Sequence, residues 1–372
     1  MLQTILKLFL VVIMTKPKAL IFWEGLTPCT RLISEFCEIC EVHLAYTAGP
    51  HDISSILEEI PAKSKILLRY HDDIDSIPCD FCDYSYIFLT GWKSRSWNRA
   101  CVRAKALNPQ LIVIVMVDNI LTRHRIIRQI VGAFYYRYVL RHIYDIAFVP
   151  GVSSFRYMEF LGHPVHRIRT GYYGAVVDKA LNDCVLREVS SDLVREPSFL
   201  FVGLDWKRKG LDILLKAYSL YIESRGQWRL DVVGCTREVL TNDLDVYCQF
   251  TNLITFHGYR DPIDVLGMMS IASCFVFPSR HDHWATVIAE AAARGCIIIS
   301  SVQAGATFDI VHPGLNGFTF DAASSNAFRH LAELMLLVSN TKSSQRTSMS
   351  HASLKVSSLF SAERFAVSAS SF

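Results

Sequence analysis

The chain has 372 residues, of which 51% are hydrophobic and 20% are charged, and its formal net charge is +3. This length and composition predict two globular domains and exclude a disordered protein. The charge is unevenly spread, because residues 92–141 contain ten basic residues and a single acid, Asp118. Such a basic segment attracts phosphates, anionic lipid headgroups or nucleic acid.

The first fourteen residues are mostly apolar, but their apolar core is too short to span a bilayer, and no small-residue cleavage site follows. We expect either a start at Met14 or a short interfacial anchor rather than a secreted protein. The eleven cysteines are scattered through apolar runs, which favours free thiols in a reducing compartment. We therefore expect a cytoplasmic protein, associated with the inner face of the cytoplasmic membrane if the basic segment binds lipid.

Apolar strands alternate with helical patterns in the first half of the chain. Strands are predicted at 18–24, 43–49, 65–70, 85–91, 111–118 and 144–151, and helices at 28–39, 95–107 and 121–143. The helix at 121–143 has one apolar stripe: Ile126, Ile127, Ile130, Val131, Phe134, Tyr135, Tyr138 and Val139. The stripe fits a core helix with a solvated cationic face, and it fits a helix that contacts an anionic membrane equally well.

A polar stretch without clear periodicity, 178–197, predicts the connection between two domains. Strands follow at 198–203, 229–234, 253–258, 274–279 and 296–301, with helices at 210–224, after Asp261-Pro262, at 286–295 and at 325–339. Residues 342–358 are rich in serine and lose the pattern, which returns at 361–370. We predict two doubly wound, Rossmann-like α/β domains facing a cleft, at 1–185 and 186–355, and a C-terminal helix at 356–372 that crosses back to the first domain.

Ligands of open parallel sheets bind at the carboxyl ends of the strands, so the loops after the second-domain strands are the candidate site. In the first loop, Gly203 ends a strand, and Lys207, Arg208 and Lys209 precede the start of a helix. Cationic side chains at a helix N-terminus can bind a diphosphate, although a solvated basic turn explains the same residues.

A second loop, 278–285, leads into a helix whose buried positions are interrupted by Glu290. Asp282 lies eight residues before Glu290, so one carboxylate stands on each side of the turn that opens the helix. A buried carboxylate needs hydrogen-bond donors, and ribose hydroxyls can supply them. The backbone amides of 284–287 are left free by the start of the helix and suit an anionic or hydroxyl-rich ligand.

These stretches resemble retaining glycosyltransferases of family 4, the group 1 glycosyltransferases, which have the GT-B fold. The family's E-x7-E motif corresponds to Asp282-x7-Glu290, and its phosphate loop to 201-FVGLDWKRKGLDILLKAY-218. The stretch 303-QAGATFDIVHPGLNGFTFD-321 is similar to the family's glycine-rich loop and G-x-N-G turn. The likeness is specific in 198–321, extends loosely over 85–370, and includes a closing segment at 156–178.

The resemblance implies a role for each matching residue. Asp282, Glu290 and Lys209 would be the catalytic residues: Asp282 contacts the transferred sugar, Glu290 holds the donor ribose, and Lys209 neutralises the diphosphate. Other donor-binding positions would be Gly203, Arg208, Trp284, Ala285, Thr286 and Val287. The family needs no metal and no cofactor besides its nucleoside-diphosphate sugar, and electrostatic stabilisation of the leaving group is its main demand.

Three positions depart from the family pattern. Leu204 stands where an arginine is usual, so Arg208 or Lys207 would have to replace it. His283 and Ala285 stand where a related motif has glycines. Val117 or Asp118 occupies the place of the family's active-site histidine, which puts Asp118 on the acceptor side.

We therefore predict a retaining hexosyltransferase that moves a sugar to a lipid-linked or polysaccharide acceptor in cell-surface polysaccharide biosynthesis. Two alternatives stay open: a sugar-nucleotide-binding protein with little or no activity, and a sugar-nucleotide epimerase. The gap between the pair Cys37/Cys40 and the pair Cys79/Cys82 is too long for a compact zinc site. His281-Asp282-His283 is not part of a known metal-binding motif, so we expect no metal. The basic segment 92–141 has no groove-reading or RNA-binding motif, so we expect peripheral contact with an anionic membrane and no nucleic acid.

Overall fold

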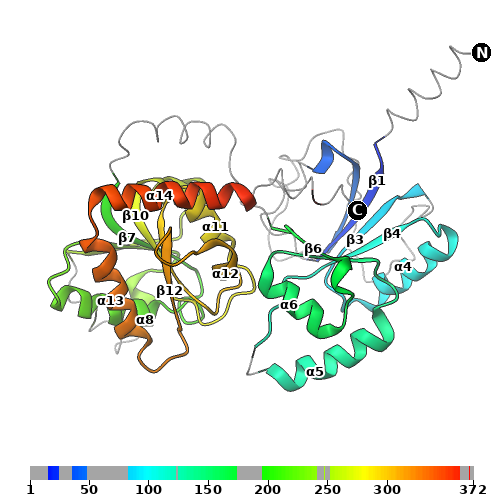
Figure 1. The fold of residues 1–372 in the computed structure, drawn as a ribbon, viewed down its shortest axis with the longest axis horizontal. Coiled ribbons are helices and arrows are strands. Elements are labelled where there is room, and N and C mark those ends of the chain that lie inside the picture. Colours follow the sequence, from blue (N-terminus) through cyan, green and yellow to red (C-terminus); the bar gives the residue numbers. More distant parts are fainter. Residues whose placement is uncertain are drawn as a thin grey trace, which may run out of the picture. The chain divides into compact units, whose positions relative to one another are not determined.

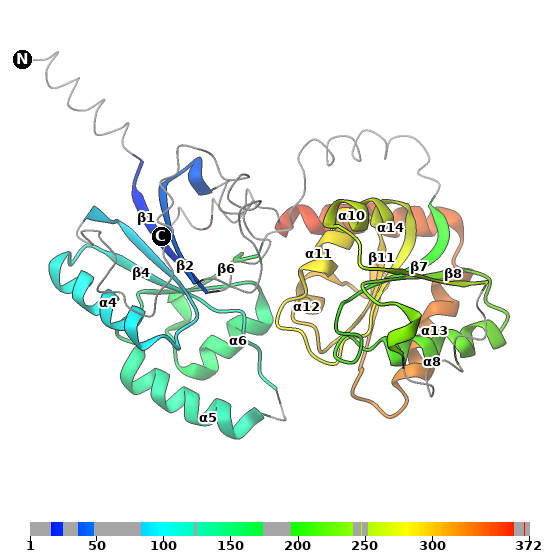
Figure 2. The same cartoon turned by 180° about the vertical axis from the view of Figure 1, so that it is seen from behind.

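The computed structural model describes residues 16–24, 36–47, 83–122, 125–173, 195–240 and 252–360, and the single positions 247 and 368. The chain divides into two compact units. The first comprises Met1–Pro150, Phe155–Tyr173 and Ala362–Phe372, and the second comprises Gly151–Ser154 and Gly174–Ser361. Figures 1 and 2 show both units, which are described separately below.

The first unit is built on a parallel sheet of six described strands in the order β2-β1-β3-β4-β5-β6. The strands are β1 (Lys18–Glu24), β2 (Glu41–Thr47), β3 (Tyr86–Thr90), β4 (Ile112–Met116), β5 (Ile146–Val149) and β6 (Ile168–Thr170). The first five confirm predicted strands, whereas β6 was not predicted. The strand predicted at 65–70 and most of the helix predicted at 28–39 lie outside the described residues.

Apolar side chains cover both faces of this sheet, which explains the continuous apolar strands of the sequence. On one face, alternate residues such as Leu20, Ile87 and Val113 pack against helix α4 (Arg95–Leu107), the π-helical turn η4 (Tyr136–Leu140) and helix α6 (Val152–Leu161). The residues between them, such as Ile21 and Phe88, form a second core on the opposite face. A short 3-10 helix, η5 (Val165–Arg167), leads into β6.

The helix predicted at 121–143 is shorter, because α5 spans Ile126–Tyr135 and then continues into the π-helical η4. None of the ten residues of α5 is buried. All eight residues of the apolar stripe are exposed, including Ile127 at 78% and Tyr138 at 72%. The interpretation of this stripe as the buried side of a core helix is therefore wrong, and in η4 it is Tyr136 and Leu140 that face the core instead.

The second unit has a parallel sheet of six described strands in the order β12-β11-β10-β7-β8-β9. The strands are β7 (Glu196–Val202), β8 (Arg229–Val233), β9 (Ile254–Gly258), β10 (Ala272–Phe277), β11 (Ile297–Ser301) and β12 (Gly317–Phe320). Five of them confirm predicted strands. Numbered within this unit, the order is 3-2-1-4-5-6, the strand order of the Rossmann fold.

Helices cover both faces of the second sheet (Figures 1 and 2). Helices α8 (Leu211–Glu223) and α13 (Ala327–Asn340) lie together on one face. On the other face lie α10 (Pro262–Ile271), α11 (Thr286–Ala293) and α14 (Ser343–Ser357), with the short α12 (Thr307–Ile310) beside α11. Two 3-10 turns, η6 (Arg237–Val239) and η8 (Ser358–Phe360), complete the unit.

Helix α14 is a correction, because its serine-rich sequence predicted no regular structure. Its buried serines pack closely on the end of α11 and the start of β11. The Ser350 hydroxyl donates to the Gly295 carbonyl and the Ser353 hydroxyl to the Cys296 carbonyl, both at 2.6 Å. Tertiary hydrogen bonds and close packing thus override the low helix propensity of serine.

The C-terminal helix predicted at 356–372 falls mostly outside the described residues. Ser358–Phe360 form η8, and Ser368 is helical and lies beside Gly171 of the first unit. Among the helices that the structure describes, none is both long and apolar enough to cross a membrane.

Candidate donor-binding site

The second sheet has its topological switch point between β7 and β10, which are neighbours although their first connections run in opposite directions. Ligands of such sheets bind outside the carboxyl ends of the strands at this point. The loops that leave β7 and β10 are 203–210 and 278–285, the two loops that the sequence singled out. Backbone contacts join them, since the Arg280 N–H donates to the Arg208 carbonyl at 2.9 Å.

Two glycines shape the loop after β7. A Cβ on Gly203 would lie 2.9 Å from Cγ of Lys209, so glycine leaves the space in which the lysine side chain runs. Gly210 begins α8 with φ of 75°, and a Cβ there would lie 2.0 Å from the Pro278 carbonyl oxygen. The second glycine therefore allows both the left-handed turn and the close approach of the two loops.

Two of the predicted cations, Lys209 and Arg208, come together at the Asp282 carboxylate. The Lys209 ammonium and the Asp282 carboxylate form an ion pair, and Nη1 of Arg208 lies 3.3 Å from the same Oδ2. Lys209 and Asp282 are mostly buried, with side-chain exposures of 16% and 13%. The Lys209 ammonium also lies 4.8 Å from the ring centroid of Phe277, a cation–π arrangement that helps to hold it in place.

A second ion pair, which the sequence did not predict, fixes the two loops. Arg280 binds Asp212 through two hydrogen bonds of 2.6 Å, and its Nη1 also donates to the Lys207 carbonyl at 2.8 Å. The bidentate geometry sets both spacing and orientation. The two residues are 68 positions apart, so no local sequence pattern connects them. The pair could have been predicted only from the expectation that both loops lie at the ends of neighbouring strands.

The turn between Asp282 and α11 is held by the segment that follows β11. Asp282 forms a parallel bridge with Ala304, and the N–H groups of Gly305 and Ala306 donate to the carbonyls of Asp282 and Trp284. Ala285 then starts α11 in the left-handed conformation, with φ of 66°, and no side chain caps the helix. The first N–H groups of α11, at Thr286 and Val287, therefore remain available to an anionic ligand.

Glu290 lies one turn inside α11. Its surroundings are dense enough that burial raises the pKa of this carboxyl, while the nearby Arg294 guanidinium acts in the opposite direction. Part of its surface nevertheless stays accessible. The site thus contains a cationic pair on Asp282, an uncapped helix N-terminus, and a carboxyl group in a low-dielectric environment.

Some predicted site residues have a different environment from the one expected. The Trp284 side chain is buried and packs 6.0 Å from the ring of Phe360, so only its backbone can face a ligand. Leu204 is 69% exposed, whereas Arg208, three residues before the helix, reaches Asp282. Asp118 belongs to the first unit, where it follows β4 and accepts a hydrogen bond from the Tyr173 hydroxyl at 3.4 Å.

No group of three or more metal-ligating side chains occurs in the part of the chain that the structure describes. The rings of His281 and His283 meet edge to face, with centroids 5.0 Å apart. Cys37 and Cys40 are free thiols, and Cys79 and Cys82 lie outside the described residues.

A Rossmann-order sheet with cationic groups and an uncapped helix at its switch point is the arrangement of a nucleotide-binding α/β domain. Together with the parallel, helix-covered sheet of the first unit, it corresponds to the GT-B architecture. Residues 187–352 match the family model described as "Glycosyl transferases group 1". This match identifies residues 187–352 as a group 1 glycosyltransferase domain.

Solved structures share the fold over nearly the whole chain. Anabaena Alr3699/HepE in complex with UDP has a TM-score of 0.72 at 12% identity, covering 95% of this chain and 98% of its own. The lipopolysaccharide outer core galactosyltransferase WaaB has a TM-score of 0.64 at 13% identity, with coverages of 95% and 98%. Sucrose-phosphate synthase from Thermosynechococcus elongatus has 0.63 at 17% identity, with coverages of 96% and 98%. No curated protein matches the chain in sequence.

Proposed function

We propose that the protein is a retaining glycosyltransferase that transfers a hexose from a nucleoside-diphosphate sugar. The observation that carries this proposal is the convergence of Lys209 and Arg208 on Asp282 at the switch point of a group 1 glycosyltransferase domain. Structures with this fold were solved with UDP and with UDP-glucose, which makes a uridine diphosphate sugar the first donor to test.

The charges of this cluster suit a departing diphosphate. Both cations pair with Asp282, and Arg208 also pairs with Asp205 at 3.2 Å, so an incoming diphosphate competes with these carboxylates for the two cations. During transfer the bond from the sugar C1 to the diphosphate oxygen breaks, the acceptor oxygen bonds to C1, and the acceptor proton leaves with the products. Lys209, Arg208 and the α11 N-terminus stabilise the negative charge that develops on the diphosphate. Asp282 is then free to contact the sugar, and Glu290 to hold the ribose.

We propose that these cations replace a metal, so that transfer needs no cofactor. The test is the rate of transfer after exhaustive treatment with EDTA, which we expect to equal the untreated rate. A loss of rate that added Mg²⁺ or Mn²⁺ restores would contradict this part of the proposal.

The acceptor we propose is a lipid-linked or polysaccharide glycan of the cell surface, with Asp118 on its side of the reaction. Support comes from the first unit, where α5 and η4 expose an apolar stripe flanked by Arg128 on one side and Arg137 on the other. A helix with this pattern lies in the interface of an anionic bilayer, where each basic residue adds about 1 kcal/mol. An enzyme attached in this way would meet acceptors that are anchored in lipid.

The decisive experiment measures release of nucleoside diphosphate and transfer of sugar from a panel of donors. We expect Lys209→Ala to lower transfer by at least about a hundredfold, the size of effect seen when one group that stabilises developing charge is removed. Glu290→Gln should also lower transfer, because an amide binds the ribose hydroxyls more weakly than a carboxylate does. The matched controls are Glu333→Gln and Lys355→Ala, which change the same residue types at exposed positions of α13 and α14. NMR of the product should show the anomeric configuration of the donor.

Other outcomes identify the alternatives. Full activity in both site variants would rule out this site, and an inverted anomer would rule out retention. Donor binding without turnover would favour a sugar-nucleotide-binding protein, and conversion of the donor into its epimer would favour an epimerase.

A further inference from the structure

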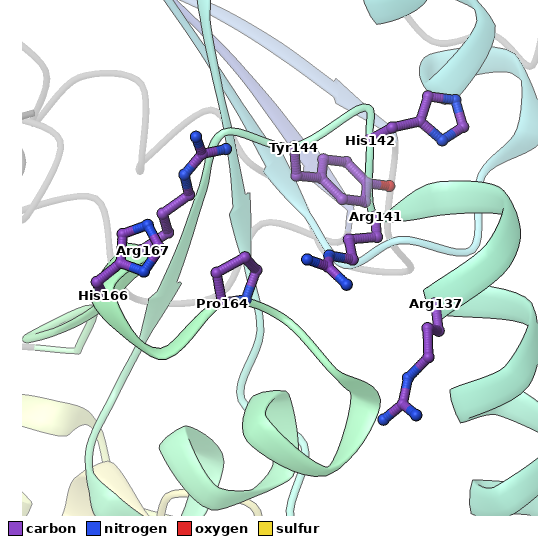
Figure 3. A pocket seen from close by; sticks show the side chains of 7 residues that line it. All are labelled: Arg137, Arg141, His142, Tyr144, Pro164, His166 and Arg167. Atoms are coloured by element: carbon purple, nitrogen blue, oxygen red, sulfur yellow. The ribbon is translucent and has the colours of Figure 1, made fainter.

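The first unit has a pocket of about 500 Å³ at the amino end of its sheet (Figure 3). Tyr144 precedes β5 and Arg167 precedes β6, so both stand before their strands rather than after them. Asp118, by contrast, follows β4 and therefore lies at the carboxyl end of the same sheet. Substrates of parallel α/β sheets bind at the carboxyl edge. The pocket is therefore separate from the acceptor side proposed above, and it is not part of the second unit.

Positive charge dominates the lining of this pocket. Seven residues line it, and none is acidic; among them are Arg137, Arg141, Arg167, His142 and His166. Figure 3 shows Arg137 and Arg141 on one side, from η4 and the turn after it, and Arg167 and His166 on the other, from η5. Within the described part of the chain, none of the three guanidinium groups forms an ion pair with a carboxylate.

The positive potential reaches the interior beneath the pocket. Burial, with smaller contributions from the charges of Arg141 and Arg167, lowers the pKa of His163 to about 4, although a hydrogen bond with the Arg167 backbone acts in the opposite direction. His163 is therefore neutral near pH 7 and adds no charge of its own. Three arginines that line one pocket and pair with no carboxylate of the described residues repel one another, and a bound anion removes that repulsion.

The pocket has fixed walls. The Tyr144 ring is buried and stacks on Tyr136, with ring centroids 6.0 Å apart. The Tyr144 hydroxyl donates to Asn98 at 2.6 Å, so the ring is held in place where it lines the pocket. A Cβ on Gly162 would lie 2.4 Å from Nε of Arg137, so this glycine lets the arginine lie across the backbone. The lining is thus shaped by buried contacts.

We propose that this pocket binds the phosphate group of a lipid headgroup or of a phosphorylated metabolite. Guanidinium groups pair with phosphate through two parallel hydrogen bonds, which makes arginine the residue type best suited to it. A volume of about 500 Å³ falls within the range of small-molecule sites, about 300–1,000 Å³, so the group that carries the phosphate also has room. Arg137 lies next to Tyr138 of the exposed stripe, which would bring lipid phosphates to the pocket if the stripe contacts a bilayer.

The test is binding of glycerol 3-phosphate to the full chain by calorimetry, with glycerol as the uncharged reference. We expect saturable binding of the phosphate compound and none of glycerol. Arg141→Gln and Arg167→Gln should each raise the Kd at least about tenfold, because a hydrogen bond to a charged group contributes about 1.5–3 kcal/mol and about 1.4 kcal/mol corresponds to a factor of ten. Arg167→Lys should weaken it less, since it keeps the charge and loses the bidentate geometry. Circular dichroism establishes that each variant is folded.

Two controls locate the binding. Arg99→Gln removes an exposed positive charge from α4, outside the pocket, and should leave the Kd unchanged. Lys209→Ala removes a cation of the donor site and should also leave it unchanged, which separates this proposal from the proposed transferase activity. Absence of saturable binding, or equal weakening by Arg99→Gln and Arg141→Gln, would overturn the proposal, and so would loss of binding in Lys209→Ala.

Vesicles distinguish the two sources of phosphate. Phosphatidylcholine vesicles containing phosphatidic acid should displace glycerol 3-phosphate if the ligand is a lipid headgroup, and pure phosphatidylcholine vesicles should not. Binding of glycerol 3-phosphate that neither vesicle displaces identifies a soluble phosphorylated ligand. Both results support a phosphate pocket.

Discussion

Ala285 has a backbone conformation that residues with a Cβ rarely adopt. Its φ of 66° and ψ of 70° lie in the left-handed region, at the turn that the donor-binding helix α11 requires. That conformation costs a non-glycine residue about 1–2 kcal/mol. The related motif has glycine at this position, and the turn keeps the conformation although the side chain has changed. The same turn depends on Gly305, because a Cβ there would lie 1.8 Å from the His283 carbonyl oxygen.

Replacing Ala285 by glycine should therefore relieve strain. Glycine also gives the unfolded chain more freedom, which offsets about 0.4–1 kcal/mol of the gain. We expect Ala285→Gly to raise the free energy of unfolding by between zero and about 1.6 kcal/mol, measured by urea denaturation. The matched control is Ala289→Gly in the interior of the same helix, which should lower it by at least about 0.5–1 kcal/mol. A similar loss of unfolding free energy in both variants would contradict the inference that Ala285 is strained.

At the scale of elements, the contact between the β7–α8 loop and the loop after β10 depends on Gly210. Alanine there would adopt the left-handed conformation and would also place its Cβ 2.0 Å from the Pro278 carbonyl oxygen. We expect Gly210→Ala to destabilise the second unit by more than the roughly 1–2 kcal/mol of the conformation alone, and to lower donor affinity because the loops separate. Urea denaturation and donor titration measure the two effects.

Gly267 provides the contrast for this prediction. It lies within α10, and a Cβ there would meet no atom within 4 Å. Gly267→Ala should therefore stabilise the protein by about 0.5–1 kcal/mol and leave donor affinity unchanged. The steric explanation fails if both glycine variants change stability in the same direction.

The elements also show what local sequence could and could not reveal. Continuous apolar runs predicted eleven strands, of which ten are confirmed and one lies outside the described residues, because burial on both faces leaves a strong local signal. Helix α14 was missed because its stability comes from serine hydroxyls on distant carbonyls, which no local pattern records. The same holds in the site: the strand ends pointed to Lys209 and Asp282, whereas the Arg280–Asp212 pair depends on the order of strands in the sheet.

For the whole molecule, the structure assigns the donor site and the apolar stripe to different units, so each can be altered without touching the other. Exposed apolar residues occur singly on most proteins, but α5 and η4 expose eight on one continuous surface. The same eight residues fit the periodicity of a core helix, and only their exposure distinguishes the two interpretations. Periodicity defines the face of a helix but does not say what covers it.

The double variant Ile127→Ser/Val131→Ser tests the proposed membrane contact. Both residues lie on the outermost line of the stripe, and burial of one such side chain contributes about 1.5–3 kcal/mol when it is complete. We expect about a tenfold loss of binding to vesicles of phosphatidylcholine and phosphatidylglycerol for each residue changed, since a factor of ten corresponds to about 1.4 kcal/mol. Ile263→Ser is the matched control, because Ile263 is 77% exposed on α10 of the second unit and should contribute nothing to vesicle binding.

Vesicle binding by the intact protein should weaken as the salt concentration rises, because Arg128 and Arg137 attract the anionic surface. Transfer to a soluble acceptor should be unchanged in the double variant, because its donor site is intact. Equal vesicle binding by the double variant and by Ile263→Ser would show that the stripe does not contact the membrane.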